Sequence, residues 1–221
     1  RNMSTEMRKY SMRRYVVPEY LKTALDFLRP PAEISVSEWC AENRILDAKS
    51  SAMPGLWRNS VTPYLVEIMD TFTDYEIEET VFVKPTQVGG TETLNNCFAY
   101  AIAQDPGPAM FVYPTDILGA SISKNRLEPM IMSSPELDKH YDARNSTDFE
   151  LQFDNMYATI SGANTPSSLA SKPIRYLFLD EVDKYPPATK KEADPISLAR
   201  ERTKTFVSNR KVFMTSTPTL R

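Results

Sequence analysis

The chain has 221 residues and a net charge of −3, and its hydrophobic and charged fractions, 41% and 25%, are those of a folded globular protein. That length is enough for one large domain with a substantial core. The single histidine, His140, excludes a metal site built from several histidines, and the overall charge gives no support for nucleic-acid binding. No apolar run approaches the length of a membrane span and no signal-peptide core begins the chain, so we expect a cytoplasmic protein.

The two ends of the sequence differ from the rest. Residues 1–33 are predicted to form a basic arm with a short helix at 19–28, which ends before Pro30 and Pro31. The first and last residues are Arg1 and Arg221, and both ends look cut, so we expect a fragment of a longer protein. The two cysteines, Cys40 and Cys97, lack metal spacing and are expected in the core.

Two further helices are predicted between the arm and residue 79. Ser35 and Glu38 form a capping-box pattern that opens a helix through Asn43, and residues 44–60 are expected to be irregular. Thr62 and Pro63 then read as the N-cap and first position of a helix. Its core-facing stripe consists of Leu65, Ile68, Met69 and Phe72. Nearby, Trp57 and Tyr64 are aromatic residues that either pack in the core or stack on a purine base.

From residue 79 onward, strands and helices alternate. Apolar strands are predicted at 80–83, 108–113, 174–179 and 211–214. Helices are predicted at 91–103, 116–132 (capped by Asp116) and 195–205, a hairpin at 149–160 around Asp154 and Asn155, and a loop at 161–173. This alternation indicates an α/β fold with a mostly parallel sheet and helices on both faces.

The loop after the first strand resembles a phosphate-binding loop. Against the pattern G-x-x-x-x-G-K-[ST], Gly89 fills the second glycine and Thr91 the hydroxyl position. Lys84 stands where the first glycine is expected, and Gly90 stands where the lysine is expected. The loop therefore keeps one lysine but places it at the opposite end. A strand, turn and helix joined by an ordinary Gly-Gly turn is the alternative interpretation.

Two further polar stretches end strands. Asp180 and Glu181 follow the apolar strand at 174–179, an arrangement in which Asp180 would hold Mg²⁺ with the Thr91 hydroxyl and Glu181 would polarise the attacking water. Thr215, Ser216 and Thr217 follow the last strand, where hydroxyls can bond both a γ-phosphate and a carboxylate. Solvated strand ends and a Ser/Thr turn are the structural alternatives. Because ligands of parallel sheets bind at the carboxyl ends of strands, one crevice is expected to hold all three stretches.

Together these stretches resemble the ATPase domain of the large terminase subunit of tailed phages, of the phage lambda type. The resemblance covers about residue 34 to the end, which implies a P-loop NTPase domain of the RecA/ASCE type over 34–221. It rests on motifs that occur in the family's order: Lys84-Pro-Thr-Gln-Val-Gly-Gly-Thr-Glu, Asp105-Pro-Gly-Pro, Arg126-Leu-Glu-Pro-Met-Ile, Leu179-Asp-Glu-Val-Asp-Lys-Tyr-Pro, Ala199-Arg-Glu-Arg-Thr-Lys-Thr-Phe and Ser216-Thr-Pro-Thr. Pro63-Tyr-Leu-Val-Glu-Ile-Met-Asp, ahead of the first strand, is also similar to that family.

The resemblance implies a motor that uses ATP and Mg²⁺ to pack double-stranded DNA into a procapsid in the cytoplasm of the infected bacterial host. It also implies a ring of large subunits at the capsid portal, paired with a small terminase subunit that recognises the viral DNA. In that family a nuclease domain follows the ATPase domain. This sequence stops at Arg221, just after the hydroxyl stretch, so we expect no DNA cleavage by this polypeptide.

The resemblance also implies roles for individual residues. Asp180 and Thr91 would bind the metal, and Glu181 would be catalytic. Lys84 would bind the nucleotide and take part in catalysis. Ser216 and Thr217 would couple hydrolysis to movement. Its ATP-binding loop comprises Lys84, Pro85, Thr86, Gln87, Val88, Gly89, Gly90, Thr91 and Glu92.

The family's finger cation, a positively charged side chain that stabilises the transition state of hydrolysis, has no clear counterpart in this sequence. The family often has an arginine near the position of Ala170, which leaves Lys172, Arg175, Arg126 and Arg202 as candidates here. Two other functions stay open: a non-catalytic nucleotide- or partner-binding module that lacks the lysine at Gly90, and a fragment of a helicase-type translocase.

Overall fold

The structure, a computed structural model, describes residues 34–49, 51–170, 172–188 and 194–218. The arm expected at residues 1–33, with its predicted helix at 19–28, lies outside the described residues. Within the described part no helix is long and apolar enough to cross a bilayer. Cys40 and Cys97 are both buried free thiols.

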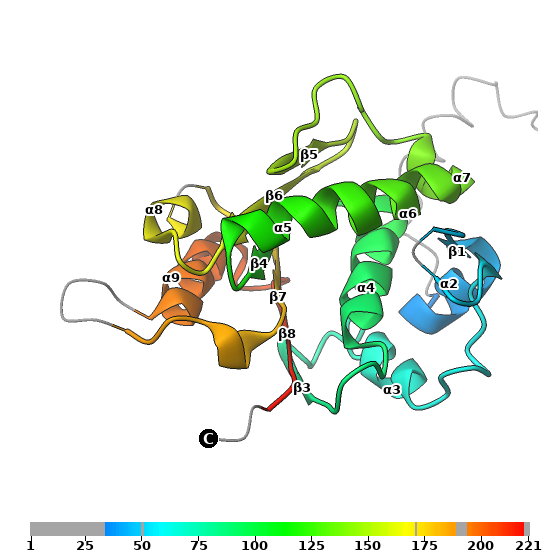
Figure 1. Ribbon diagram of the computed structural model, residues 1–221, viewed down its shortest axis with the longest axis horizontal. Helices are drawn as coiled ribbons and strands as arrows, with labels where there is room; N and C mark the ends of the chain where they lie inside the picture. Colours follow the sequence, from blue (N-terminus) through cyan, green and yellow to red (C-terminus); the bar gives the residue numbers. More distant parts are fainter. Residues whose placement is uncertain (1–33, 50, 171, 189–193, 219–221) are drawn as a thin grey trace, which may run out of the picture. The chain divides into compact units, whose positions relative to one another are not determined.

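A six-stranded sheet organises the domain (Figure 1). Its strands in spatial order are β3 (Glu79–Val83), β8 (Lys211–Ser216), β7 (Tyr176–Leu179), β4 (Ala109–Tyr113), β6 (Tyr157–Gly162) and β5 (Glu150–Gln152). Neighbouring strands from β3 to β6 pair in parallel, and β5 pairs antiparallel with β6. The predicted mostly parallel sheet and the predicted hairpin are therefore confirmed.

Apolar side chains fill both faces of this sheet. Along β4, Phe111 faces one side and packs edge-on against Phe98 of α4 (Gly90–Gln104). Met110 and Val112 face the other side, where they cluster with α8 (Pro166–Leu169) and α9 (Pro195–Glu201). Figure 1 shows α4 on one side of the strands and α8 and α9 on the other. A strand buried on both faces needs no polar positions, which is why its sequence is continuously apolar.

The elements before the sheet differ in part from the prediction. Helix α2 (Val36–Asn43) begins at the predicted capping box, in which Ser35 and Glu38 bond each other's backbone N–H. The stretch expected to be irregular contains a short hairpin, β1 (Ile45–Leu46) paired with β2 (Gly55–Leu56).

The predicted N-cap of the next helix is wrong. Residues 61–64 form turns, and α3 (Leu65–Asp70) begins only at Leu65, whose N–H bonds the Thr62 carbonyl. The Thr62 hydroxyl therefore caps nothing. The predicted stripe is confirmed, because Leu65, Met69 and Phe72 are buried.

The helix predicted at 116–132 is one rod of three parts. It comprises α5 (Asp116–Ile122), a π-helical stretch η1 (Ser123–Leu127) and α6 (Glu128–Ser133), followed by the short α7 (Pro135–Asp138). Its cap is Thr115, whose hydroxyl accepts the Leu118 N–H at 3.2 Å, and not the predicted Asp116. The Asp116 carboxylate instead accepts the Gly162 N–H at 2.6 Å, because this aspartate faces the end of β6.

Four short helical segments lie among the described residues between β6 and β8. The stretch expected as a loop at 161–173 contains α8, and the helix predicted at 195–205 is α9 followed by the 3₁₀ segment η3 (Arg202–Phe206). A second 3₁₀ turn, η2 (Val182–Lys184), follows β7 directly.

An aromatic cluster at the centre of the sheet gives a test of this core. Phe178 is 1% exposed and its ring lies 4.8 Å from Phe111 and 5.9 Å from Phe72. Phe178→Ala should lower the free energy of unfolding by about 3–5 kcal/mol, measured by denaturant titration, because it leaves a cavity among rings. Tyr75→Ala is the control, since that ring is 97% exposed. Equal losses for the two variants would contradict this assignment of the core.

Candidate active site

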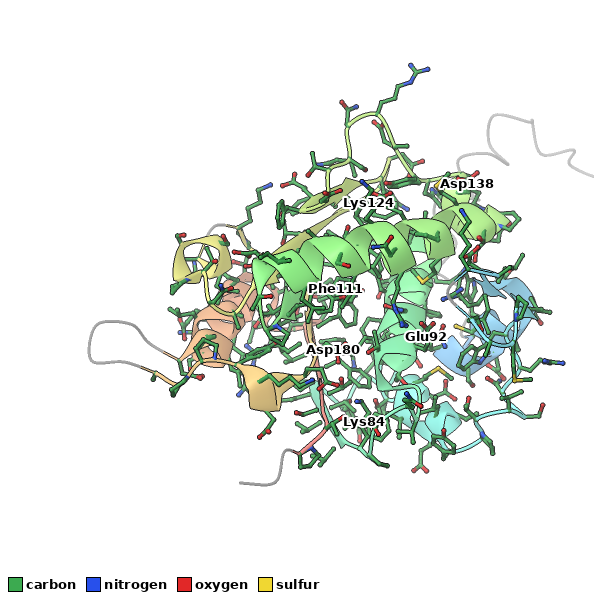
Figure 2. All side chains as sticks on the ribbon, in the orientation of Figure 1. Lys84, Glu92, Phe111, Lys124, Asp138 and Asp180 are labelled. Atoms are coloured by element: carbon green, nitrogen blue, oxygen red, sulfur yellow. The ribbon has the colours of Figure 1, made fainter. Side chains whose placement is uncertain are left out.

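The three polar stretches of the sequence meet at one edge of the sheet. In the parallel register, Val83 pairs with Ser216 and Leu179 pairs with Met214, so β3, β7 and β8 all end at that edge. Beyond the strands, the Lys84 N–H bonds the Ser216 carbonyl at 3.0 Å. Figure 2 shows Lys84 and Asp180 at this end of the strands.

The Lys84 side chain lies inside the site. It is 5% exposed, and its Nζ donates to Glu181 Oε1 at 3.2 Å and to Thr217 Oγ1 at 3.0 Å. The Lys84 side chain packs directly against Gly90: a Cβ added at residue 90 would lie 1.9 Å from Lys84 Cε and 2.3 Å from Lys84 Cδ. Lys84 therefore occupies the space beside residue 90, and a side chain at residue 90 would displace it.

The loop between Lys84 and Gly90 is open and contains unusual backbone angles. Pro85, Thr86 and Gln87 are exposed, and Gln87 has φ of 60°. Gly89 has φ of 86° and directly precedes α4, whose N-terminus has no side-chain cap. The first N–H groups of a helix lack partners within the helix, so this end can accept an anion.

Asp180 is the most enclosed acidic group of the site. It is 2% exposed, and its carboxylate accepts hydrogen bonds from Thr91 Oγ1 at 2.8 Å, from Thr215 Oγ1 at 2.5 Å and from the Glu181 N–H at 3.0 Å. The Thr91 hydroxyl and the Asp180 carboxylate are adjacent hard oxygen donors, which fit Mg²⁺. Among the described residues no group of three His, Cys, Asp or Glu side chains forms a metal cage. Mg²⁺ usually needs none, because phosphates and water complete its coordination.

Glu181 lies between two lysines. Its Oε1 contacts Lys84, and its Oε2 lies 2.9 Å from Lys184 Nζ. Burial pushes the pKa of Glu181 up, but hydrogen bonds from Lys184 and Lys84 outweigh that effect, so the pKa lies below its usual value. The carboxylate is therefore ionised at neutral pH and accepts hydrogen bonds. Its backbone φ of 55° is left-handed, which is uncommon outside glycine and is often found at functional sites.

The hydroxyl stretch at the end of β8 links the other two. Ser216 Oγ accepts the Asp183 N–H at 2.9 Å, and Thr217 Oγ1 lies within hydrogen-bond distance of Lys84 and, at 3.5 Å, of Glu181. Thr215 lies in the predicted hydroxyl stretch, of which only Ser216 and Thr217 were given an individual role. It belongs to the site through its hydrogen bond to Asp180.

Glu92, predicted to be part of the ATP-binding loop, is bound to other elements. Its carboxylate lies 3.1 Å from Arg44 and 3.7 Å from Arg126, and it accepts a hydrogen bond from Asn95. Arg44 has a side chain only 3% exposed, and nothing in its sequence context indicates that it is buried. Glu92 thus ties the start of α4 to the end of α2 and to the π-helical stretch.

Two of the four candidate finger cations are held by partners elsewhere. Arg175 bonds both oxygens of Asp105, at 2.8 and 2.5 Å, and stands just before β7, at the edge of the sheet opposite Asp180. Lys172 lies 2.7 Å from Glu150 and over the ring of Tyr157.

The other two candidates differ in their distance from the loop. Arg202 donates to the carbonyl of Ala170 at 3.3 Å, away from the phosphate loop. Arg126 is 47% exposed and pairs with Glu92, two residues after Gly90. Arg126 is therefore the one of the four whose partner lies in the first turn of α4, directly after the loop.

The two aromatic residues upstream of the sheet also differ. Trp57 is 6% exposed and its Nε1 donates to Asn59, so it packs in the core. Tyr64 is 51% exposed, and its hydroxyl donates to the Val88 carbonyl of the loop at 3.2 Å.

Comparison with solved structures gives the same fold in phage proteins. The large terminase of bacteriophage HK97 is 11% identical, with a TM-score of 0.64, over 84% of this chain and 38% of that one. The large terminase of the thermophilic bacteriophage D6E in complex with ADP is 12% identical, with a TM-score of 0.51, over 70% of this chain and 38% of that one. The chain thus spans about two fifths of either protein. The likeness confirms the predicted fold.

Comparison by sequence gives the family. No curated protein matches the sequence. The family described as "Phage terminase large subunit gpA, ATPase domain" matches residues 51–221, most of the chain. The chain therefore belongs to the family of ATPase domains of the phage terminase large subunit gpA.

Proposed function

We propose that this domain hydrolyses ATP in the presence of Mg²⁺ and that the large subunit uses this hydrolysis to move double-stranded DNA into a procapsid. The observation that carries the proposal is the convergence on Lys84, whose ammonium bonds Glu181 at 3.2 Å and Thr217 at 3.0 Å. A cation, an ionised carboxylate and a hydroxyl from three strand ends are the groups that phosphoryl transfer to water requires.

The roles follow from the positions of these groups. Lys84 and the open N-terminus of α4 bind the β- and γ-phosphates, with the loop from Pro85 to Gly90 around them. Asp180 and Thr91 hold Mg²⁺, which neutralises phosphate charge when bound. Glu181 orients and polarises the attacking water, because it is ionised and accepts hydrogen bonds.

Ser216 and Thr217 are proposed to couple hydrolysis to movement. Ser216 accepts the backbone N–H of Asp183, two residues after Glu181, and Thr217 bonds Lys84. Loss of the γ-phosphate would change the partners of Lys84, and Thr217 would pass that change to β8.

The proposal extends to the partners that the family implies. We propose a ring of large subunits at the portal, with a small terminase subunit, in the cytoplasm of the infected host. The expectation that this polypeptide does not cut DNA stays a prediction.

Arg126 is proposed as the finger cation. It is half exposed on the π-helical stretch, and its partner Glu92 holds it at 3.7 Å, a loose contact that phosphate charge can replace. Arg175 and Lys172 have closer acidic partners.

The catalytic assignment predicts two inactive variants. Glu181→Gln and Lys84→Ala should each lower the rate of phosphate release from ATP at least about 100-fold, because one removes the ionised carboxylate and the other the phosphate-binding cation. Glu201→Gln is the matched control, since Glu201 also pairs with a lysine three residues on. A wild type that binds ATP without hydrolysing it, alone and with DNA, would favour the non-catalytic module instead.

The path of Lys84 over Gly90 predicts a specific coupling. Gly90→Ala should weaken binding of a non-hydrolysable ATP analogue about as much as Lys84→Ala, roughly 10-fold or more, because the methyl group displaces the lysine. The double variant should bind as weakly as Lys84→Ala alone, since the same interaction is lost only once. A double variant much weaker than Lys84→Ala would show that the added methyl group obstructs the nucleotide itself. Calorimetric titration measures all four proteins.

The finger assignment predicts a defect in rate rather than in binding. Arg126→Ala should lower kcat by about 10³-fold with a change in KM for ATP of only a few fold, because a finger stabilises charge that develops in the transition state. Arg144→Ala removes an exposed loop arginine and serves as the charge-matched control. Unchanged kcat in Arg126→Ala, with DNA and assembled rings present, would exclude this residue.

A further inference from the structure

Each carboxylate oxygen of Glu181 has its own lysine. Lys84 Nζ lies 3.2 Å from Oε1, and Lys184 Nζ lies 2.9 Å from Oε2. The two lysines differ in setting, because the Lys84 side chain is 5% exposed and the Lys184 side chain is 54% exposed. The proposed function uses Lys84 for phosphate and gives Lys184 no role.

The backbone after β7 fixes where Lys184 stands. The 3₁₀ turn η2 brings the Lys184 N–H to the Glu181 carbonyl at 3.0 Å. Glu181 directly precedes the turn with left-handed backbone angles, and the turn leaves Lys184 Nζ 2.9 Å from Glu181 Oε2. The turn is held to the sheet by the Asp183 N–H to Ser216 at 2.9 Å and by the Tyr185 hydroxyl to the Val112 carbonyl at 2.6 Å.

Two other pairs of this chain have the same spacing and differ in burial. Lys139 pairs with Glu136 and Lys204 pairs with Glu201, both three residues apart, and these glutamates are 44% and 49% exposed. Pairs of that kind are solvated and contribute little. Glu181 is only 20% exposed, so its contact with Lys184 restricts the carboxylate more than the other two pairs restrict theirs.

The demands on the two lysines then differ during the reaction. Lys84 Nζ bonds Glu181 and Thr217, and a bound triphosphate offers it more negative charge than one carboxylate. When Lys84 turns to phosphate, Oε1 loses its lysine and becomes free to accept a hydrogen bond from water. Oε2 keeps Lys184, which is built into the turn that follows Glu181.

We propose that Lys184 is a positioning residue: it holds Oε2 of Glu181 so that Oε1 faces the water when Lys84 binds phosphate. This inference rests on the proposed ATPase function. It assigns Lys184 no contact with the nucleotide, which separates it from Lys84 and from the finger cation.

Kinetics of three variants test the assignment. Lys184→Ala should lower kcat roughly 10-fold to 100-fold with KM for ATP nearly unchanged, because the carboxylate is misplaced while the phosphate site is intact. Lys184→Arg should restore most of the rate, since a guanidinium can hold the same oxygen. Lys204→Ala, the matched pair at Glu201, should behave as wild type. A rise in KM for Lys184→Ala, or a kcat equal to that of Lys204→Ala, would overturn the proposal.

A second measurement does not depend on turnover. In a crystal structure of the chain with Mg²⁺ and a non-hydrolysable ATP analogue, Lys84 should contact phosphate while Lys184 stays within about 4 Å of Glu181 Oε2. Lys184 on a phosphate, or away from Glu181, would overturn the proposal. A wild type without ATPase activity would count against the proposed function, and this structure would still decide whether Lys184 holds the carboxylate.

Discussion

The contact on which the site depends is the buried ammonium of Lys84 among the ends of three strands. A charge that is 5% exposed is unfavourable unless partners compensate for lost hydration, and here Glu181 and Thr217 provide that compensation. Glycine at residue 90 is part of the same arrangement, because any side chain there would meet the lysine. The acidic strand end, the hydroxyl strand end and the glycine are thus one interdependent set.

Sheet topology explains how this set assembles from distant parts of the sequence. In the six-stranded sheet, the order β3, β8, β7 places its last strand in the sequence between its first strand and the strand that Asp180 follows. Parallel pairing makes all three strands end at one edge, so Lys84, Asp180 and Thr217 meet without any long loop. The rings of Phe111 and Phe178 stack on one face of the sheet and help to hold its strands in register. The contacts among Lys84, Asp180 and Thr217 depend on that register.

The parts of the fold that the sequence predicts are those governed by periodicity and strand ends. Continuous apolar strands, the capping box at Ser35 and the three polar strand ends all have local signals, and the structure contains them. Caps were harder, because Thr115 and Asp116 are both good N-cap types and only the position of β6 decides between them.

The residues that sequence analysis missed depend on tertiary contacts. Arg44 directly follows a helix, a position where arginine is usually exposed. Here it is buried and pairs with Glu92, which is distant in the sequence. Lys184 lies in an acidic motif whose carboxylates are the residues that the sequence marks as functional. Its proposed role depends on the 3₁₀ turn, which brings its Nζ to 2.9 Å from Glu181. Neither geometry can be deduced from spacing alone.

Moving the lysine from residue 90 to residue 84 has a mechanical consequence. A lysine at residue 90 would belong to α4 and would move with that helix. Lys84 belongs to the end of β3, and its own N–H bonds the carbonyl of Ser216 at the end of β8. Lys84, the cation proposed to bind the phosphates, is therefore joined twice to the end of β8, once through the backbone of Ser216 and once through the hydroxyl of Thr217 directly after it. If Lys84 binds the phosphates as proposed, a change there would reach β8 through contacts within the sheet.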